Sequence, residues 1–157
     1  MNKKIYDRAL ILFLAFNALI WIPWGAICLL KPEAWSGQVI PGMEVFDLSD
    51  AVARTEVRAM YGGLQMAIGM LALIAVFKPQ HRDTTLLFYV LALSGLALSR
   101  LAGLVIEGSA DIFVFSMNGV TKETYNQIGL AMYEFPSFIV AWVLLLTKYF
   151  SKGVRAL

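Results

Sequence analysis

Four long apolar stretches constrain the fold of this chain more than any other feature of its sequence. They cover residues 9–30, 59–77, 86–106 and 128–147. Charged residues interrupt them only at Arg100 and Glu134. A helix of about 20 apolar residues crosses a hydrocarbon core of roughly 30 Å. The stretches therefore predict an all-α fold, a polytopic membrane four-helix bundle that forms a single domain over residues 1–157.

The composition supports lipid as the solvent for most of the chain. Hydrophobic residues make up 59% of it and charged residues only 15%, whereas a soluble domain is about a quarter charged. The net charge of +2 comes without a basic stripe, so nucleic-acid binding is not expected. Cys28 and His81 are the only cysteine and histidine. We therefore expect no internal disulfide, no metal site and no haem held by two histidines.

Lysine and arginine residues indicate how the bundle is oriented. The first apolar stretch is longer than the 7–15 residues typical of a signal-peptide core, so we interpret it as a retained transmembrane helix. Eight basic residues then fall on the side of the two termini: Lys3, Lys4, Arg8, Lys78, Arg82, Lys148, Lys152 and Arg155. Four fall on the other side: Lys31, Arg54, Arg58 and Lys122. Because cytoplasmic loops carry the excess of positive charge, both termini are expected in the cytoplasm.

Small residues recur every four positions on the second and third stretches. They are Ala59, Gly63 and Ala67, then Gly95, Ser99 and Gly103. Small side chains let two helix backbones approach closely in lipid. The pattern predicts that the second and third helices form the tight pair of the bundle.

Each stretch also places one polar or amphipathic residue about six positions from its outer end, roughly 9 Å deep. These residues are Trp24, Gln65, Arg100 and Glu134. A lone charge at the membrane centre costs about 2.5–3.5 kcal/mol. We therefore expect Arg100 to pair with Glu134. Nearer the surface, Arg58 and Glu107 are candidates for a second pair, and Asn17 is expected to form an interhelical hydrogen bond.

This polar layer is the candidate site. The predicted ligand-binding residues are Trp21, Trp24, Arg58, Tyr61, Gln65, Arg100, Glu107, Tyr133 and Glu134. Glu107 and Glu134 are also the candidates for proton transfer. A purely structural interpretation stays open, because buried ion pairs can simply fix which helix neighbours which. The number of polar groups exceeds what four helices need, and this favours a pocket.

Three segments carry a family resemblance. They are RAMYGGLQ at residues 58–65, SRLAG at 99–103 with Glu107-Gly108, and YEFP at 133–136. Together they resemble an uncharacterised family, a domain of unknown function, of small four-helix bacterial inner-membrane proteins with an RAxYGG motif, over roughly residues 10–150. The resemblance implies the four-helix architecture, the grouping of the polar residues and a bacterial inner (plasma) membrane location. It implies no activity.

A more distant similarity is to DoxX-like proteins and to the bundles of the sterol isomerase and sigma-two-receptor group. These place acidic residues in a membrane cavity that holds an amphipathic ligand. The similarity is one of architecture, and architecture does not fix function. The catalytic residues of the isomerase group do not align with this sequence one by one.

Four functions follow as hypotheses, of which transport is the weakest, because four helices lack an obvious inverted repeat and would need to oligomerise. The first is a binding module for a small amphipathic or lipid-like molecule, in a polar-lined cavity open to the outer leaflet. The second is an enzyme, for instance a double-bond isomerase acting on a lipid or isoprenoid, although Arg100 would hold Glu134 in its charged form. The third is a structural subunit of a membrane complex, which predicts a filled core rather than a cavity. Membrane lipids are expected partners, and the sequence leaves open a homo-oligomer or a partner complex.

Overall fold

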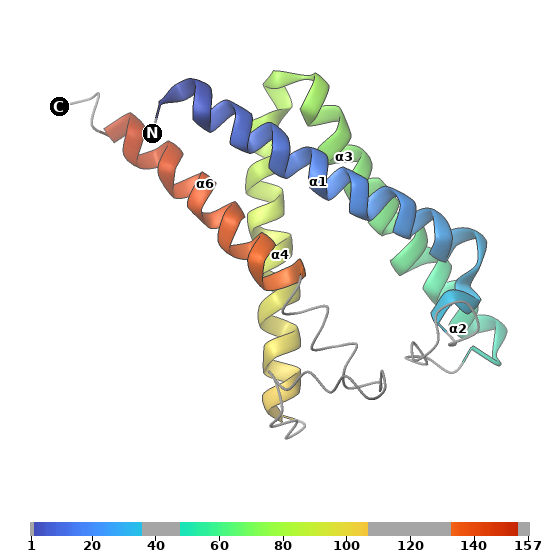
Figure 1. The fold of residues 1–157 in the computed structure, drawn as a ribbon. Coiled ribbons are helices and arrows are strands. Elements are labelled where there is room, and N and C mark those ends of the chain that lie inside the picture. The colour runs from blue at the N-terminus through green and yellow to red at the C-terminus, as the bar shows by residue number, and fades with distance from the viewer. Residues whose placement is uncertain (1, 36–47, 107–132, 154–157) are drawn as a thin grey trace, which may run out of the picture.

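The computed structural model describes residues 2–35, 48–106 and 133–153, and these residues are helical, with no strand among them (Figure 1). The long helices are α1 (Lys3–Leu30), α3 (Gln65–Phe77), α4 (Arg82–Ile106) and α6 (Phe135–Gly153). The short elements are α2 (Ala51–Glu56), η2 (Val57–Leu64), and the 3₁₀ turns η1 (Pro32–Trp35) and η3 (Pro79–His81). The fold class expected from the sequence is thus confirmed as all-helical.

Three stretches among the described residues are long and apolar enough to cross a membrane. They are Lys3–Leu30, Ala51–Phe77 and Pro79–Gly103. The apolar part of the last helix, Phe135–Phe150, is shorter. The first part of the fourth predicted span, residues 128–132, lies outside the described residues. Large apolar side chains also cover the outside of the bundle, which suits a lipid environment.

The helices extend beyond the predicted apolar stretches because polar residues continue and cap them. Asn2 accepts a hydrogen bond from the backbone N–H of Lys4 at 3.0 Å and so begins α1 six residues earlier than predicted. Asp50 does the same for the N–H of Val52 at 3.2 Å, so the second helix begins at Ala51, eight residues before its apolar stretch.

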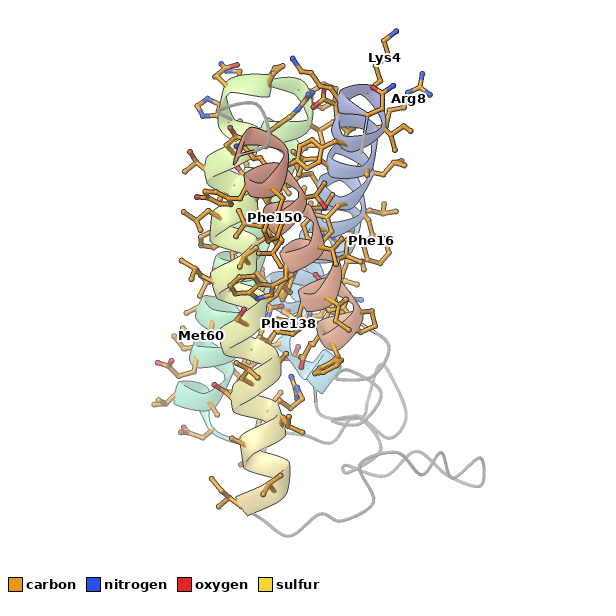
Figure 2. The ribbon with its side chains drawn as sticks, turned by 90° about the vertical axis from the view of Figure 1, so that its left-hand side faces the viewer. Lys4, Arg8, Phe16, Met60, Phe138 and Phe150 are labelled. Carbon is orange, nitrogen blue, oxygen red and sulfur yellow. The ribbon has the colours of Figure 1, made fainter. Side chains whose placement is uncertain are left out.

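Arg82 closes the turn between α3 and α4. Its guanidinium donates to the carbonyls of Ala75 at 3.1 Å and Val76 at 2.9 Å, two of the carbonyls left free where α3 ends. This turn lies at the same end of the bundle as the start of α1 and the last turns of α6 (Figure 1). Lys4 and Arg8 project from that end (Figure 2).

The tight helix pair is α1 with the η2–α3 stretch, so the predicted pairing of the second and third helices is wrong. A Cβ added to Gly62 would lie 2.8 Å from the Cα of Leu29, and one added to Gly69 would lie 2.8 Å from the backbone nitrogen of Ile22. Around Gly95 and Gly103, by contrast, no neighbouring atom lies within 4 Å of such a Cβ. Close approach therefore follows the glycines that face α1, and Gly95 and Gly103 of α4 do not contribute to it.

The segment Val57–Leu64, sequence VRAMYGGL, is π-helical and continuous with α2 before it and α3 after it. It contains the whole RAxYGG motif. A π-helix bonds each N–H five residues back and is usually confined to a single turn, frequently at functional sites. This wider helix carries Gly62 against α1 and turns Met60, Tyr61 and Leu64 toward α4.

The main core joins all four long helices. Its most deeply buried members include Leu14 of α1, Ala72 of α3, Leu93 of α4 and Ala141 of α6. Tyr89 is also 1% exposed, and its hydroxyl donates to the carbonyl of Ile68 at 3.0 Å, linking α4 to α3.

Candidate functional site

A cavity of about 330 Å³ lies between the second helix and α4, with α1 behind it. Its size is at the lower end of the range for ligand pockets. The lining residues come from three helices and are Trp21, Met60, Tyr61, Leu64, Gln65, Ile68, Tyr89, Ala92, Leu93 and Leu96. None of these side chains carries a charge, so the cavity suits a molecule that is largely apolar.

Three of the predicted ligand-binding residues meet in the wall of this cavity. Tyr61 is placed there by the π-helical turn, Gln65 by the first turn of α3 and Trp21 by the middle of α1. Trp21 is only 9% exposed. Oε1 of Gln65 is buried without a hydrogen-bond partner among the described residues, and the buried side chain of Trp21 has the hydroxyl of Tyr133 as its polar neighbour.

The predicted ion pair forms beside the cavity, between α4 and the start of α6. Nε of Arg100 lies 2.7 Å from Oε2 of Glu134, and the two side chains are 25% and 6% exposed. The pairing expected from the sequence is therefore confirmed. Because the carboxylate of Glu134 is engaged by Arg100 and Glu134 does not line the cavity, the geometry offers it no direct reach to a molecule bound there.

A second polar contact ties α6 to α1. The hydroxyl of Tyr133 donates to Oδ1 of Asn17 at 2.6 Å, and Nδ2 of Asn17 donates to the carbonyl of Phe13 at 2.8 Å. The predicted interhelical hydrogen bond of Asn17 is thus confirmed. Tyr133 also contacts Trp21 edge-on, with ring centroids 5.6 Å apart, so the cavity and the polar contacts share one wall.

The remaining predicted residues lie elsewhere. Trp24 packs against the small cluster of Cys28, Leu48 and Val57, away from the cavity lining. Arg58 is exposed. Glu107, and with it the proposed Arg58–Glu107 pair, lies outside the described residues. The site is therefore more apolar than the predicted polar layer.

Several lining residues were not predicted, notably Tyr89 and the apolar side chains of η2 and α4. Tyr89 carried a usable signal, since a tyrosine deep inside an apolar stretch needs a buried partner for its hydroxyl. The apolar lining residues carried none, because they look the same in sequence whether they face a cavity, a neighbouring helix or lipid. No group of three or more His, Cys, Asp or Glu that could hold a metal occurs in the part of the chain that the structure describes.

Apolar helices of spanning length, bundled around an uncharged cavity, are features of a small helical protein suited to a membrane. The chain belongs to the family described as a domain of unknown function, DUF4345, whose model matches residues 9–120. The RAxYGG and SRLAG segments lie inside the matched range, and YEFP at 133–136 lies beyond it. No curated protein and no solved structure matches the chain.

Proposed function

We propose that this protein is a membrane module that binds a small amphipathic or lipid-like molecule in the cavity between its second helix and α4. The observation that carries the proposal is the cavity of about 330 Å³ itself. A bundle that served only as a structural subunit would fill this space with side chains, because voids forfeit packing energy.

The surroundings of the cavity support binding over catalysis. The only carboxylate described near it, that of Glu134, is engaged by Arg100 at 2.7 Å. Proton transfer would need a carboxyl group within hydrogen-bond reach of the bound molecule. The cavity lining instead supplies aromatic and aliphatic surface from Trp21, Tyr61 and Leu64.

We further propose a bacterial inner-membrane location with both termini in the cytoplasm. Lys4, Arg8, Lys78 and Arg82 support this orientation, because they belong to the end of the bundle where α1 starts and α3 turns into α4. Residues Met60–Ile68 then lie around the middle of the second helix, Ala51–Phe77, and Trp21 lies in the half of α1 farther from the cytoplasm. We propose that the ligand enters from the outer leaflet.

The experiment is native mass spectrometry with lipid analysis of protein purified in mild detergent. Ala92→Phe puts a ring into the cavity, and Ala102→Phe makes the same change at an exposed position of α4. We expect the wild type and Ala102→Phe to retain a defined molecule that Ala92→Phe loses. Bulk phospholipid in equal amounts on all three proteins would rule out the proposed binding.

A further inference from the structure

A second cavity, of about 240 Å³, opens between the start of α4 and the last turns of α6. Its lining residues are Asp83, Thr84, Leu87, Leu145, Lys148 and Tyr149. The ammonium of Lys148 forms an ion pair with Oδ2 of Asp83. The lining thus combines one charge of each sign with two leucines, whereas the cavity between the second helix and α4 has no charged side chain in its wall.

This second cavity lies at the level of the lipid headgroups. Asp83 is the second residue of α4, and a transmembrane helix ends where the hydrocarbon core gives way to the headgroups. The basic side chains at the start of α1 project from the same end of the bundle (Figure 2). Leu87 lies one turn further into α4 than Asp83, and Leu145 lies one turn further into α6 than Lys148. The two charges therefore belong to the headgroup region, and the leucines lie at the depth where acyl chains begin.

The two charges narrow the class of headgroup. Clusters of Lys and Arg are typical of sites for anionic lipids, but here Asp83 repels an anion that Lys148 attracts. A zwitterionic headgroup places its phosphate beside Lys148 and its ammonium beside Asp83, so that opposite charges adjoin throughout. A primary ammonium also donates a hydrogen bond to the carboxylate, which the trimethylated ammonium of a choline headgroup cannot do.

We propose that this cavity binds the headgroup of a phosphatidylethanolamine from the adjoining leaflet, with the phosphate at Lys148 and the primary ammonium at Asp83. In this lipid the phosphate is bonded to the glycerol, so it lies nearer the hydrocarbon than the ammonium does. The exposed fractions of the two side chains follow the same order, 20% for Lys148 and 63% for Asp83. The acyl chains then begin against Leu87 and Leu145.

The volume suits such a headgroup. A water molecule takes about 30 Å³ in the liquid, so 240 Å³ is about eight such volumes. A phosphoethanolamine group has about as many non-hydrogen atoms, so the cavity holds the headgroup and leaves the acyl chains outside. None of its lining residues belongs to the lining of the larger cavity, so the two cavities can be occupied independently.

The test is native mass spectrometry of the protein in detergent micelles that contain equal amounts of phosphatidylethanolamine, phosphatidylcholine and phosphatidylglycerol. All three lipids carry palmitoyl and oleoyl chains, so only the headgroup differs. We expect the wild type to bind phosphatidylethanolamine at least about threefold more than either other lipid, a ratio that one ionic contact at a partly exposed site can supply.

Variants of the ion pair test the position of the lipid. Asp83→Asn should abolish the preference for phosphatidylethanolamine and increase binding of phosphatidylglycerol, because the lining then has a net positive charge. The double variant Asp83→Lys with Lys148→Asp keeps an ion pair but reverses its direction, so it should lose the preference without losing the fold. Two controls should keep the preference. Lys4→Gln removes a charge from the same end of the bundle, and Ala92→Phe fills the larger cavity.

The opposite results are equally specific. Equal binding of the three lipids by the wild type, or strongest binding of phosphatidylglycerol, would overturn the proposed headgroup. A preference that survives both Asp83→Asn and the double variant would overturn the position. If Ala92→Phe loses the preference and Asp83→Asn keeps it, the lipid occupies the larger cavity, which overturns this inference and supports the proposed function. Displacement of the lipid by glycerophosphoethanolamine at equal concentration would show that a soluble headgroup suffices, and would overturn the lipid.

Discussion

Tyr133 and Asn17 are 116 residues apart in the chain, and the hydroxyl of one donates to the amide oxygen of the other at 2.6 Å. The contact joins the first helix to the last. Asn17 is fully buried, and its amide nitrogen is bound to the carbonyl of Phe13, so both ends of the side chain are satisfied. A satisfied polar contact in an apolar interior fixes which helices are neighbours, since a wrong pairing would leave it open.

We expect the Asn17–Tyr133 contact to add modestly to stability. Tyr133→Phe removes the donor and leaves Oδ1 of Asn17 unpaired, and Asn17→Leu removes the acceptor. Hydrogen bonds between membrane helices are worth about 0.6 kcal/mol on average and up to about 1.7 kcal/mol. A double-mutant cycle of unfolding in mixed micelles with increasing dodecyl sulfate should give a coupling energy in this range. A coupling of zero would show that the bond contributes nothing.

Breaking the Arg100–Glu134 pair should lower the free energy of unfolding more than breaking the Asn17–Tyr133 hydrogen bond. Arg100→Met leaves the carboxylate of Glu134, 6% exposed, without its cation. Loss of one partner of a fully buried pair costs about 3–5 kcal/mol, and the 25% exposure of Arg100 lowers this to about 1–3 kcal/mol. The same unfolding assay measures it. Asp83→Asn is the control, since it breaks the ion pair with Lys148 at a largely exposed carboxylate and should cost under about 1 kcal/mol.

Glycine substitutions should distinguish the tight contact of Gly62 and Gly69 with α1, here called the seam, from the open face of α4. An alanine at Gly62 or Gly69 drives its Cβ into the backbone of α1, and overpacking costs about 1–3 kcal/mol. Gly95→Ala meets no atom within 4 Å and should be neutral or stabilising by up to about 1 kcal/mol from helix propensity. Thermal unfolding in detergent gives the ranking. An equal loss at all three positions would contradict the seam.

Cysteine labelling tests the proposed topology. Cys28 is the only cysteine of the chain, so a Cys28→Ala background contains no thiol. Gln80→Cys lies in the turn between α3 and α4, and Ser49→Cys lies before α2 at the other end of the second helix, both at exposed positions. In intact bacterial cells, a reagent that cannot cross the inner membrane should label Ser49→Cys and spare Gln80→Cys. The reverse pattern would invert the topology.

The sequence was most informative where an unpaired charge or polar group in lipid would be energetically costly, because such a group must then have a partner. A charge in lipid must find its opposite, so the pairing of Arg100 with Glu134 followed from two lone charges at similar depth. The interhelical hydrogen bond of Asn17 was predicted by the same reasoning, applied to a polar group instead of a charge. The existence of the long helices was equally predictable, whereas α1 begins six residues before its apolar stretch because its capping residue, Asn2, lies outside that stretch.

The sequence was least informative about which small residues touch. Gly63 and Gly95 belong to regular four-residue patterns, yet neither lies in a tight helix contact. Gly62 and Gly69, seven positions apart and so on one face of an α-helix, carry the seam with α1. The four-residue spacing of Ala59, Gly63 and Ala67 therefore selected the wrong face. The cavity was equally hidden, because its apolar lining resembles any lipid-facing surface.

The seam of Gly62 and Gly69 against α1 also bears on how such a protein can change over evolutionary time. The apolar surface toward lipid accepts many side chains, since one aliphatic group there serves nearly as well as another. At the seam, backbone meets backbone, and any mutation adds atoms where none fit. Sequences drifting from a common ancestor should thus diverge freely over their outer surface and stay fixed at these two positions, so distant relatives of this chain are better sought by their glycines than by overall identity.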